Sequence, residues 1–242
     1  MAEGPAMTDF GARLRALDWA GLRTDLDRQG WAVAPLLSPE ACSALDALWE
    51  GEAAFRKCVV MERHAFGQGC YKYWRDPLPT PVAEMRQALY DALMPLAEAW
   101  RARLGGGQAY PVDYAEYRAR CRAAGQAQPT PLLLRYAQGG YNCLHQDLYG
   151  TELFPLQAAI LLSRPGVDFS GGEFVLVEQR PRAQSRAEIV PLGQGDMVVF
   201  AVNHRPVRGV RKWHRTALRH GVSTVRTGAR STLGLILHDA AS

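Results

Sequence analysis

The first half of the chain repeats apolar residues at the spacing of an amphipathic helix. One such run predicts a single helix along Phe10, Leu14, Leu17 and Leu22. A longer run predicts a helix from Pro81 to Leu104, because the spacing holds over several turns before a run of glycines ends it. The apolar positions of this long helix are Val82, Met85, Leu89, Leu93, Leu96 and Trp100.

Another helix is predicted directly after Ser38. The Ser38 side chain can cap the first free backbone N–H groups of a helix, and Pro39 suits the first helical position. Its buried side would carry Cys42, Leu45, Leu48 and Trp49.

From Pro131 onward, short apolar runs are separated by Gly, Pro and Asp, which is typical of a β-sandwich or barrel. These runs are Leu132–Leu134, Leu156–Leu162, Glu173–Val177, Met197–Val202 and Leu233–Leu237. We therefore predict an α+β protein with a flexible N-terminus over 1–7 and a single domain over 8–242. Within that domain, a helical part of about 8–125 would pack on a β-core of about 130–240.

The stretch from Arg63 to Pro79 has no clean period and is rich in aromatic residues, including Tyr71, Tyr73 and Trp74. We interpret it as an irregular loop. Two roles stay open for it: a lid that closes over a substrate, or a packed connection between elements.

Composition adds that the chain is an ordinary globular protein, since 48% of its residues are hydrophobic and 21% are charged. No apolar run approaches the length that crosses a bilayer, and no secretion signal is recognisable at the start. The cysteines are odd in number and form no CxxC pair, which favours reduced thiols and a cytoplasmic location. They are Cys42, Cys58, Cys70, Cys121 and Cys143.

The net charge of +4 is distributed unevenly. No acidic residue stands between Asp196 and Asp239, a stretch that holds many cations. Such a one-signed region would attract an anionic partner, whether a small acid, a nucleic acid or an acidic protein. The cations are Arg205, Arg208, Arg211, Lys212, Arg215, Arg219, Arg226 and Arg230.

The first candidate metal ligands are His145 and Asp147. On a strand, residues two apart point to the same face, so this His-x-Asp pair can reach one metal ion. One imidazole and one carboxylate are two of the three ligands of the facial triad in non-heme Fe(II) oxygenases. By itself the pair is a weak signal, because a surface histidine beside a capping aspartate has the same spacing.

His220 is the preferred third ligand, and His204 stays open as the alternative. A strand bearing His220 would run into a Gly-containing turn, and the next strand would open with Arg230. The guanidinium of Arg230 could bind a carboxylate through two parallel hydrogen bonds, a geometry that lysine cannot supply. His64, His214 and His238 receive no metal role.

These residues together resemble the 2-oxoglutarate/Fe(II) oxygenase superfamily over about 110 residues. His145, Asp147, His220 and Arg230 match its His-x-Asp pair, its distal His and the Arg about ten residues later. The stretch from Arg135 to Asp147 is similar to the RYxxGxxYxxHxD run of the prolyl-hydroxylase-like branch.

The resemblance implies a double-stranded β-helix (jelly-roll) core, Fe(II) as the metal and 2-oxoglutarate as the co-substrate. It implies that Arg230, with Tyr136, binds the 2-oxoglutarate carboxylate. O₂ and 2-oxoglutarate would be converted to succinate and CO₂ while the substrate is hydroxylated, or demethylated through a hydroxylated methyl group. The whole chain also resembles a little-characterised bacterial family for which action on damaged nucleic acid has been suggested.

The substrate is left open between a nucleic acid and a peptide (prolyl-type) or small molecule. For a nucleic acid, Arg211 and Trp213 could track the strand. Tyr71, Tyr73 and Trp74 could line a pocket for a flipped base, and Arg75 is a further candidate for substrate contact. A hypothesis of another class is a non-catalytic β-barrel binding module. A cupin-type site is disfavoured because the second position of the pair is Asp147.

Overall fold

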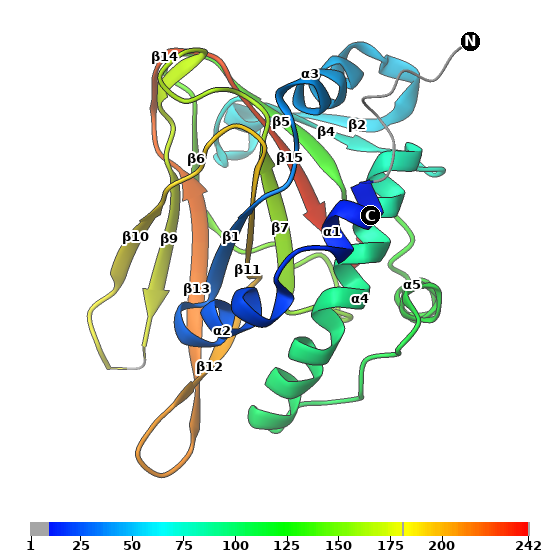
Figure 1. Cartoon of the computed structure of the whole chain (residues 1–242), viewed down its shortest axis with the longest axis vertical. Helices are drawn as coiled ribbons and strands as arrows, with labels where there is room; N and C mark the ends of the chain where they lie inside the picture. The colour runs from blue at the N-terminus through cyan, green and yellow to red at the C-terminus, as the bar shows by residue number, and fades with distance from the viewer. Residues whose placement is uncertain (1–9, 181, 242) are drawn as a thin grey trace.

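Two antiparallel sheets face each other, and helices cover the outer face of the larger one (Figure 1). This computed structural model describes residues 10–180 and 182–241. The predicted flexible N-terminus over 1–7 lies outside the described residues. The arrangement is the mixed helix and double-stranded β-helix architecture that the sequence predicts.

The larger sheet has the strand order β1-β11-β7-β15-β5-β4-β2. Its strands are β1 (Trp31–Pro35), β11 (Asp196–Ala201), β7 (Leu156–Leu161), β15 (Arg230–Ile236), β5 (Leu132–Tyr136), β4 (Cys70–Trp74) and β2 (Phe55–Val60). The smaller sheet has the order β10-β9-β13-β6-β3, and β12 pairs with β13 beside it. Its strands are β10 (Arg186–Val190), β9 (Phe174–Gln179), β13 (Trp213–Val222), β6 (Tyr141–His145), β3 (Gly67–Gln68) and β12 (His204–Arg208). A two-stranded ribbon of β8 (Phe169–Gly171) and β14 (Val225–Gly228) lies at one end.

The helices are α1 (Phe10–Arg15), α2 (Trp19–Gln29), α3 (Pro39–Ala47), α4 (Thr80–Arg103) and α5 (Tyr114–Ala123). The long helix is confirmed as α4, and the Ser38-capped helix as α3, where Ser38 Oγ accepts the Ala41 N–H at 3.3 Å. Because α3 ends at Ala47, Leu48 and Trp49 lie beyond it and are only partly buried. The prediction of one helix over Phe10 to Leu22 is wrong. The chain breaks before Trp19 because the Asp18 carboxylate accepts the Gly21 N–H at 3.0 Å and caps a new helix. In 10–180 and 182–241, no helix has both the length and the apolar character needed to cross a membrane.

The part predicted as helical, about 8–125, also contributes strands β1 to β4. The predicted irregular loop over 63–79 contains β4, which is paired to both β2 and β5. Lys72 conceals the strand pattern: its ammonium is buried through an ion pair with Glu52 and a contact over the Trp49 ring. A charged residue therefore occupies a buried position that a sequence pattern expects to be apolar.

Side-chain alternation divides the larger sheet into a structural face and a functional face. On β15, Leu233 and Leu235 pack in the main core with the helices. Arg230 and Thr232 point the other way, into a cavity between the two sheets. The helices thus stabilise the scaffold, while the inner face is left for chemistry.

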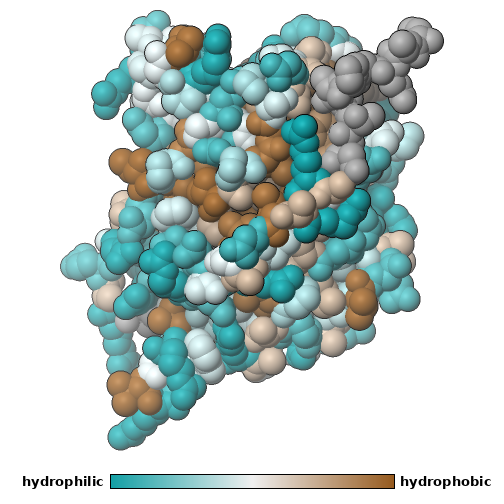
Figure 2. Space-filling model, in the orientation of Figure 1, coloured by the Kyte–Doolittle hydropathy of each residue, from teal (hydrophilic) through white to brown (hydrophobic). Residues whose placement is uncertain are grey.

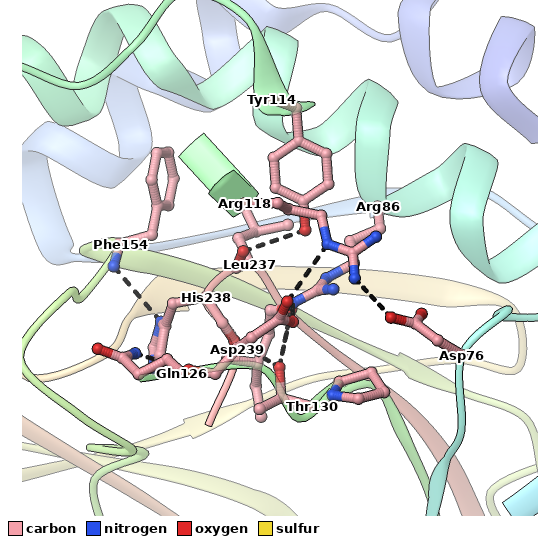
Figure 3. A network of polar contacts seen from close by, with 12 residues as sticks. Asp76, Arg86, Tyr114, Arg118, Gln126, Thr130, Phe154, Leu237, His238 and Asp239 are labelled. Carbon is pink, nitrogen blue, oxygen red and sulfur yellow. Dashed lines mark hydrogen bonds and ion pairs between the residues drawn. The ribbon is translucent and has the colours of Figure 1, made fainter. Parts of the chain in front are cut away.

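A buried ionic network fastens the helices to the end of the chain (Figure 3). Arg86 of α4 contacts Asp239 at 2.7 Å, and both residues are 1% exposed. Arg118 of α5 reaches the second Asp239 oxygen at 3.2 Å and Asp76 at 2.9 Å. Thr130 also accepts a hydrogen bond from Arg86 at 3.2 Å. Asp239 is therefore the shared anion of two cations on different helices.

Replacing Asp239 with alanine is expected to lower the free energy of unfolding by about 3–5 kcal/mol, because it leaves a buried guanidinium without its counter-charge. Denaturant unfolding followed by circular dichroism measures this. The control is Asp25→Ala, which breaks the exposed Arg28–Asp25 pair of α2 and should cost less than about 1 kcal/mol. Equal losses in the two variants would contradict the structural role of Asp239.

Candidate active site

The cavity between the sheets has a volume of about 350 Å³. This lies within the range of roughly 300–1,000 Å³ typical of small-molecule sites. Its walls come from both sheets and include Tyr136, Gln157 and Arg230 on the larger and His145 and His220 on the smaller. The sandwich therefore encloses the candidate chemistry that the sequence singles out.

The residues His145, Asp147 and His220 meet in this cavity with their ligand atoms within 4.8 Å of one another. His145 ends β6, and its Cα partner across the sheet is His220 on β13. Asp147 lies two residues beyond the end of β6. Its Oδ1 is 3.6 Å from His145 Nε2 and its Oδ2 is 3.3 Å from His220 Nε2. This donor set, two imidazoles and one carboxylate, is the one that suits non-heme Fe(II) with positions left open.

The hydrogen bonds of His145 fix which of its nitrogens can bind a metal. Nδ1 lies 2.8 Å from the Cys143 carbonyl oxygen, which can only accept a hydrogen bond. Nδ1 therefore carries the proton, and Nε2 presents its lone pair to the cluster. His220 is held differently, with its ring centroid 4.7 Å from that of Phe200 and 6.0 Å from that of Phe174.

The residues of the cluster shift one another's pKa values. Burial alone would raise the pKa of Asp147, but the hydrogen bond and charge of His220, followed by the charge of His145, lower it well below its usual range. Burial and the neighbouring His145 lower the pKa of His220. The two directions favour the forms that bind a metal, an ionised carboxylate and a neutral imidazole.

Arg230 is the second unusual group in the cavity. It is 2% exposed, and no acidic residue in the described part of the chain pairs with it. Its Nη1 donates to Thr232 Oγ1, and its buried Nε has no partner among the described residues. Burial lowers its pKa to about 10. A buried guanidinium without a counter-charge is costly, so this wall of the cavity is built for an anion.

Tyr136 lies beside Arg230, and the two residues are Cα partners on β5 and β15. The guanidinium carbon of Arg230 is 5.8 Å from the centre of the Tyr136 ring. The phenol accepts a hydrogen bond from Asn142 at 3.3 Å, and burial raises its pKa to about 12, so it stays a hydroxyl donor. Gly228 sets the turn before β15, since it has φ +75° and an added Cβ would lie 2.0 Å from the Asp168 carbonyl oxygen.

Three residues proposed for substrate contact lie on or next to β4, and the structure separates them. Tyr71 and Tyr73 line the cavity, with ring centroids 5.3 Å apart. Arg75 is exposed and donates to the Phe55 carbonyl oxygen at 3.0 Å. It does not line the cavity, and neither does Trp74, which is buried in the main core.

Arg211 and Trp213 belong to the β12–β13 hairpin, which projects from the sandwich at the bottom of Figure 1. Figure 2 shows this projection as mainly hydrophilic, with a small hydrophobic area near its end. Arg211 is exposed, and the Trp213 ring lies 4.8 Å from the Arg103 guanidinium and 5.3 Å from that of Arg208. Neither residue lines the cavity. His204, at the base of the hairpin, lines a different pocket and is not part of the metal cluster.

Among the polar residues of the cavity that the sequence interpretation missed are Tyr149, Gln157 and Thr232. Tyr149 and Thr232 each stand two residues after a residue that it did identify, Asp147 and Arg230. Strand alternation could have placed Thr232 on the same face of β15 as Arg230, whereas Asp147 and Tyr149 lie in the loop after β6. Gln157 could have been noticed as the one polar residue of the apolar run from Leu156 to Leu162.

The mouth of the cavity carries exposed apolar side chains. Phe66 is 47% exposed and Leu144 is 45% exposed, and both line the cavity. The Phe66 ring stacks on His64 at 5.3 Å, and the Phe66 carbonyl oxygen accepts the Cys143 N–H at 2.9 Å. Ala65 has φ 56°, an uncommon left-handed conformation for a residue with a Cβ. This rim, Phe66 with His64 and Leu144, is thus a fixed apolar and aromatic edge.

Residues 69–240 match the model of a known protein family. It is the Oxygenase-NA family, described as oxygenases catalysing oxidative methylation of damaged DNA. Two curated proteins, from two strains of Mycobacterium tuberculosis, are each 50% identical to the chain over 165 residues. The aligned part covers 68% of this chain and 71% of each relative, and both relatives are described as uncharacterized.

Solved structures agree on the fold. A prolyl-4-hydroxylase from Pseudomonas putida has a TM-score of 0.52 at 15% identity, covering 89% of this chain and 96% of that one. An oxidoreductase of the 2OG-Fe(II) oxygenase family from Burkholderia pseudomallei also gives 0.52, at 16% identity, with 93% and 94% covered. A prolyl hydroxylase from Trichoplax adhaerens gives 0.52 at 14% identity, with 94% and 91% covered. At these identities the likeness shows the double-stranded β-helix alone.

Proposed function

The chain belongs to the Oxygenase-NA family, and from this membership we propose that it is an Fe(II)- and 2-oxoglutarate-dependent dioxygenase acting on a damaged base in DNA. The observation that carries the cofactor assignment is the pairing of two features in one cavity. One is a cluster of two imidazoles and one carboxylate, and the other is a buried arginine that lacks an acidic partner within the described residues.

His145, Asp147 and His220 would hold Fe(II), and Arg230 with Tyr136 would hold the far carboxylate of 2-oxoglutarate. The donor set fits a non-heme iron, and the orphaned Nε of Arg230 fits a carboxylate bound through two parallel N–H groups. The Thr232 hydroxyl, which already contacts Arg230, is placed to join the same carboxylate. The co-substrate would supply the missing negative charge.

When bound, iron and 2-oxoglutarate supply the oxidation: O₂ is reduced, 2-oxoglutarate becomes succinate and CO₂, and one oxygen atom enters the substrate. The protein's own residues position the reactants and exclude water. Phe174 and Phe200 shield His220, while Leu134 and Ile236 line the cavity wall. On a methylated base, hydroxylation of the methyl group would lead to its loss.

A DNA substrate is supported by the family description and by the rim of the cavity. An enzyme that oxidises a base must take that base out of the duplex stack or act on a single strand. An aromatic rim offers a stacking surface to neighbouring bases. Phe66, which is exposed at the mouth and stacked on His64, fits this role. Tyr71 and Tyr73 would then contact the extruded base within the cavity. A cytoplasmic location goes with this proposal, since the five cysteines, all in the described part of the chain, are free.

The test compares succinate formation with single-stranded DNA containing alkylated bases, undamaged DNA, and a proline-containing peptide. We expect stimulation by the damaged DNA, and the stimulation should weaken steeply with added salt through counterion release. Stimulation by the peptide alone would replace the substrate assignment but leave the cofactor assignment intact. Unchanged cellular function in His145→Ala would instead favour a non-catalytic binding module.

Phe66→Ala is expected to weaken DNA affinity roughly 5- to 100-fold, because stacking on one aromatic ring contributes about 1–3 kcal/mol per base. Fluorescence anisotropy with labelled DNA measures this. The matched control is Val112→Ala, which removes an exposed apolar side chain between α4 and α5. Iron and 2-oxoglutarate binding should be unchanged in both variants. Equal DNA affinity in wild type and Phe66→Ala would show that the rim does not bind DNA.

A further inference from the structure

Asp147 is held by more contacts than the other two members of the metal cluster. Its Oδ1 accepts the Tyr149 hydroxyl at 2.7 Å, and its Oδ2 accepts the Gln157 amide Nε2 at 2.8 Å. Its backbone carbonyl oxygen lies 3.2 Å from His238 Nε2. The carboxylate is therefore fixed at both oxygens and at the main chain.

The direction of each contact can be assigned. At neutral pH the carboxylate only accepts hydrogen bonds, so Gln157 must turn its NH₂ toward it. This leaves Gln157 Oε1 buried without a partner among the described residues. The Phe154 N–H donates to His238 Nδ1 at 3.4 Å, so Nε2 carries the proton and donates to Asp147. The Gln157 side chain is thus oriented to donate to Asp147, although its own Oε1 then lacks a hydrogen-bond donor.

A further residue extends the chain of contacts toward the substrate side of the cavity. The Tyr73 hydroxyl donates to the Tyr149 hydroxyl at 3.1 Å, and the Tyr149 hydroxyl donates to Asp147. Tyr149 and Gln157 come from different segments, one from the loop after β6 and the other from β7 of the larger sheet. Together they fasten the loop that carries Asp147 to the rigid scaffold.

We propose that Tyr149 and Gln157 are positioning residues that orient the Asp147 carboxylate for metal binding. Each carboxylate oxygen has two lone pairs, so the two hydrogen bonds leave one on each oxygen for the side facing His145 and His220. The Asp147 carboxylate is thereby oriented toward the metal position before the metal binds. Such outer contacts commonly change metal affinity by roughly 10- to 100-fold. The inference rests on the proposed metal-binding role of Asp147.

The test is a titration of apo protein with Co(II), followed by its visible absorption, in wild type, Tyr149→Phe and Gln157→Leu. We expect each variant to bind Co(II) roughly tenfold or more weakly, with an altered spectrum, because the carboxylate can rotate. Matched controls are Tyr110→Phe, which loses a hydrogen bond to the Leu153 carbonyl oxygen, and Gln194→Leu, which loses one to Leu162. Both controls should bind Co(II) as wild type does.

The comparison is made on variants whose circular dichroism matches wild type. If one substitution prevents folding, Tyr73→Phe takes its place, since it removes only the outer contact to Tyr149 and should give a smaller loss. Affinity within twofold of wild type in the folded variants, with an unchanged spectrum, would overturn the proposal. No Co(II) binding by wild type would be a different result, because it would reject the metal site itself.

Discussion

Replacing Arg230 with methionine is expected to weaken 2-oxoglutarate binding roughly 100-fold or more, while Fe(II) still binds. Removing one partner of a buried, hydrogen-bonded charge pair costs about 2–5 kcal/mol, and each 1.4 kcal/mol is about tenfold. Arg230 is buried and has no acidic partner within the described chain, so the co-substrate would be its only counter-charge. Anaerobic calorimetric titration of the iron-loaded protein with 2-oxoglutarate measures the loss.

Two further variants make this prediction specific. Arg230→Lys keeps the charge but loses the two parallel donors, so we expect an intermediate loss. Arg226→Met removes an exposed arginine of β14 and should leave the affinity unchanged. The apo protein should also melt at a higher temperature in Arg230→Met, because an unpaired buried charge has been replaced by an apolar chain of similar length. Wild-type affinity in Arg230→Met would show that the carboxylate binds elsewhere.

His220→Ala is expected to weaken Fe(II) binding by roughly 100-fold or more. Substitution of a residue that hydrogen-bonds to a metal ligand already lowers metal affinity about 10- to 100-fold, so loss of a ligand itself should lower it further. His204→Ala is the matched control, because His204 lies on the neighbouring strand β12 but outside the cluster. Equilibrium dialysis with Fe(II) under argon distinguishes the two. A larger loss in His204→Ala than in His220→Ala would reverse the assignment of the third ligand.

The β-core could be predicted from the sequence because its strands are apolar runs between turn residues. Each run became a strand: β5, β7, β9, β11 and β15. The cluster could be predicted because His145 and Asp147 are close in sequence, and because a Gly-containing turn and Arg230 after His220 favoured that histidine. Spacing alone left His204 open, since the choice depends on which strand pairs with β6, and that pairing is a long-range property of the sheet.

The strands that the first half of the chain adds to the larger sheet could not be predicted in the same way. β4 has aromatic residues on one face and Lys72 with Trp74 on the other, so it shows no apolar alternation. Lys72 is tolerated inside because Glu52, twenty residues earlier, pairs with it. The contacts of Asp147 with Tyr149 and Gln157 were missed for the same reason: the role of a buried polar residue depends on its partner, and these partners come from different segments.

The most direct test of Fe(II) and 2-oxoglutarate binding in this cavity is an anaerobic titration of the apo protein with both, followed by visible absorption. We expect the charge-transfer band of the chelated complex in wild type and His204→Ala, no band in His220→Ala, and a band only at much higher 2-oxoglutarate concentration in Arg230→Met. If folded wild-type protein developed no band at saturating Fe(II) and 2-oxoglutarate, the assignment of both cofactors to this cavity would be wrong.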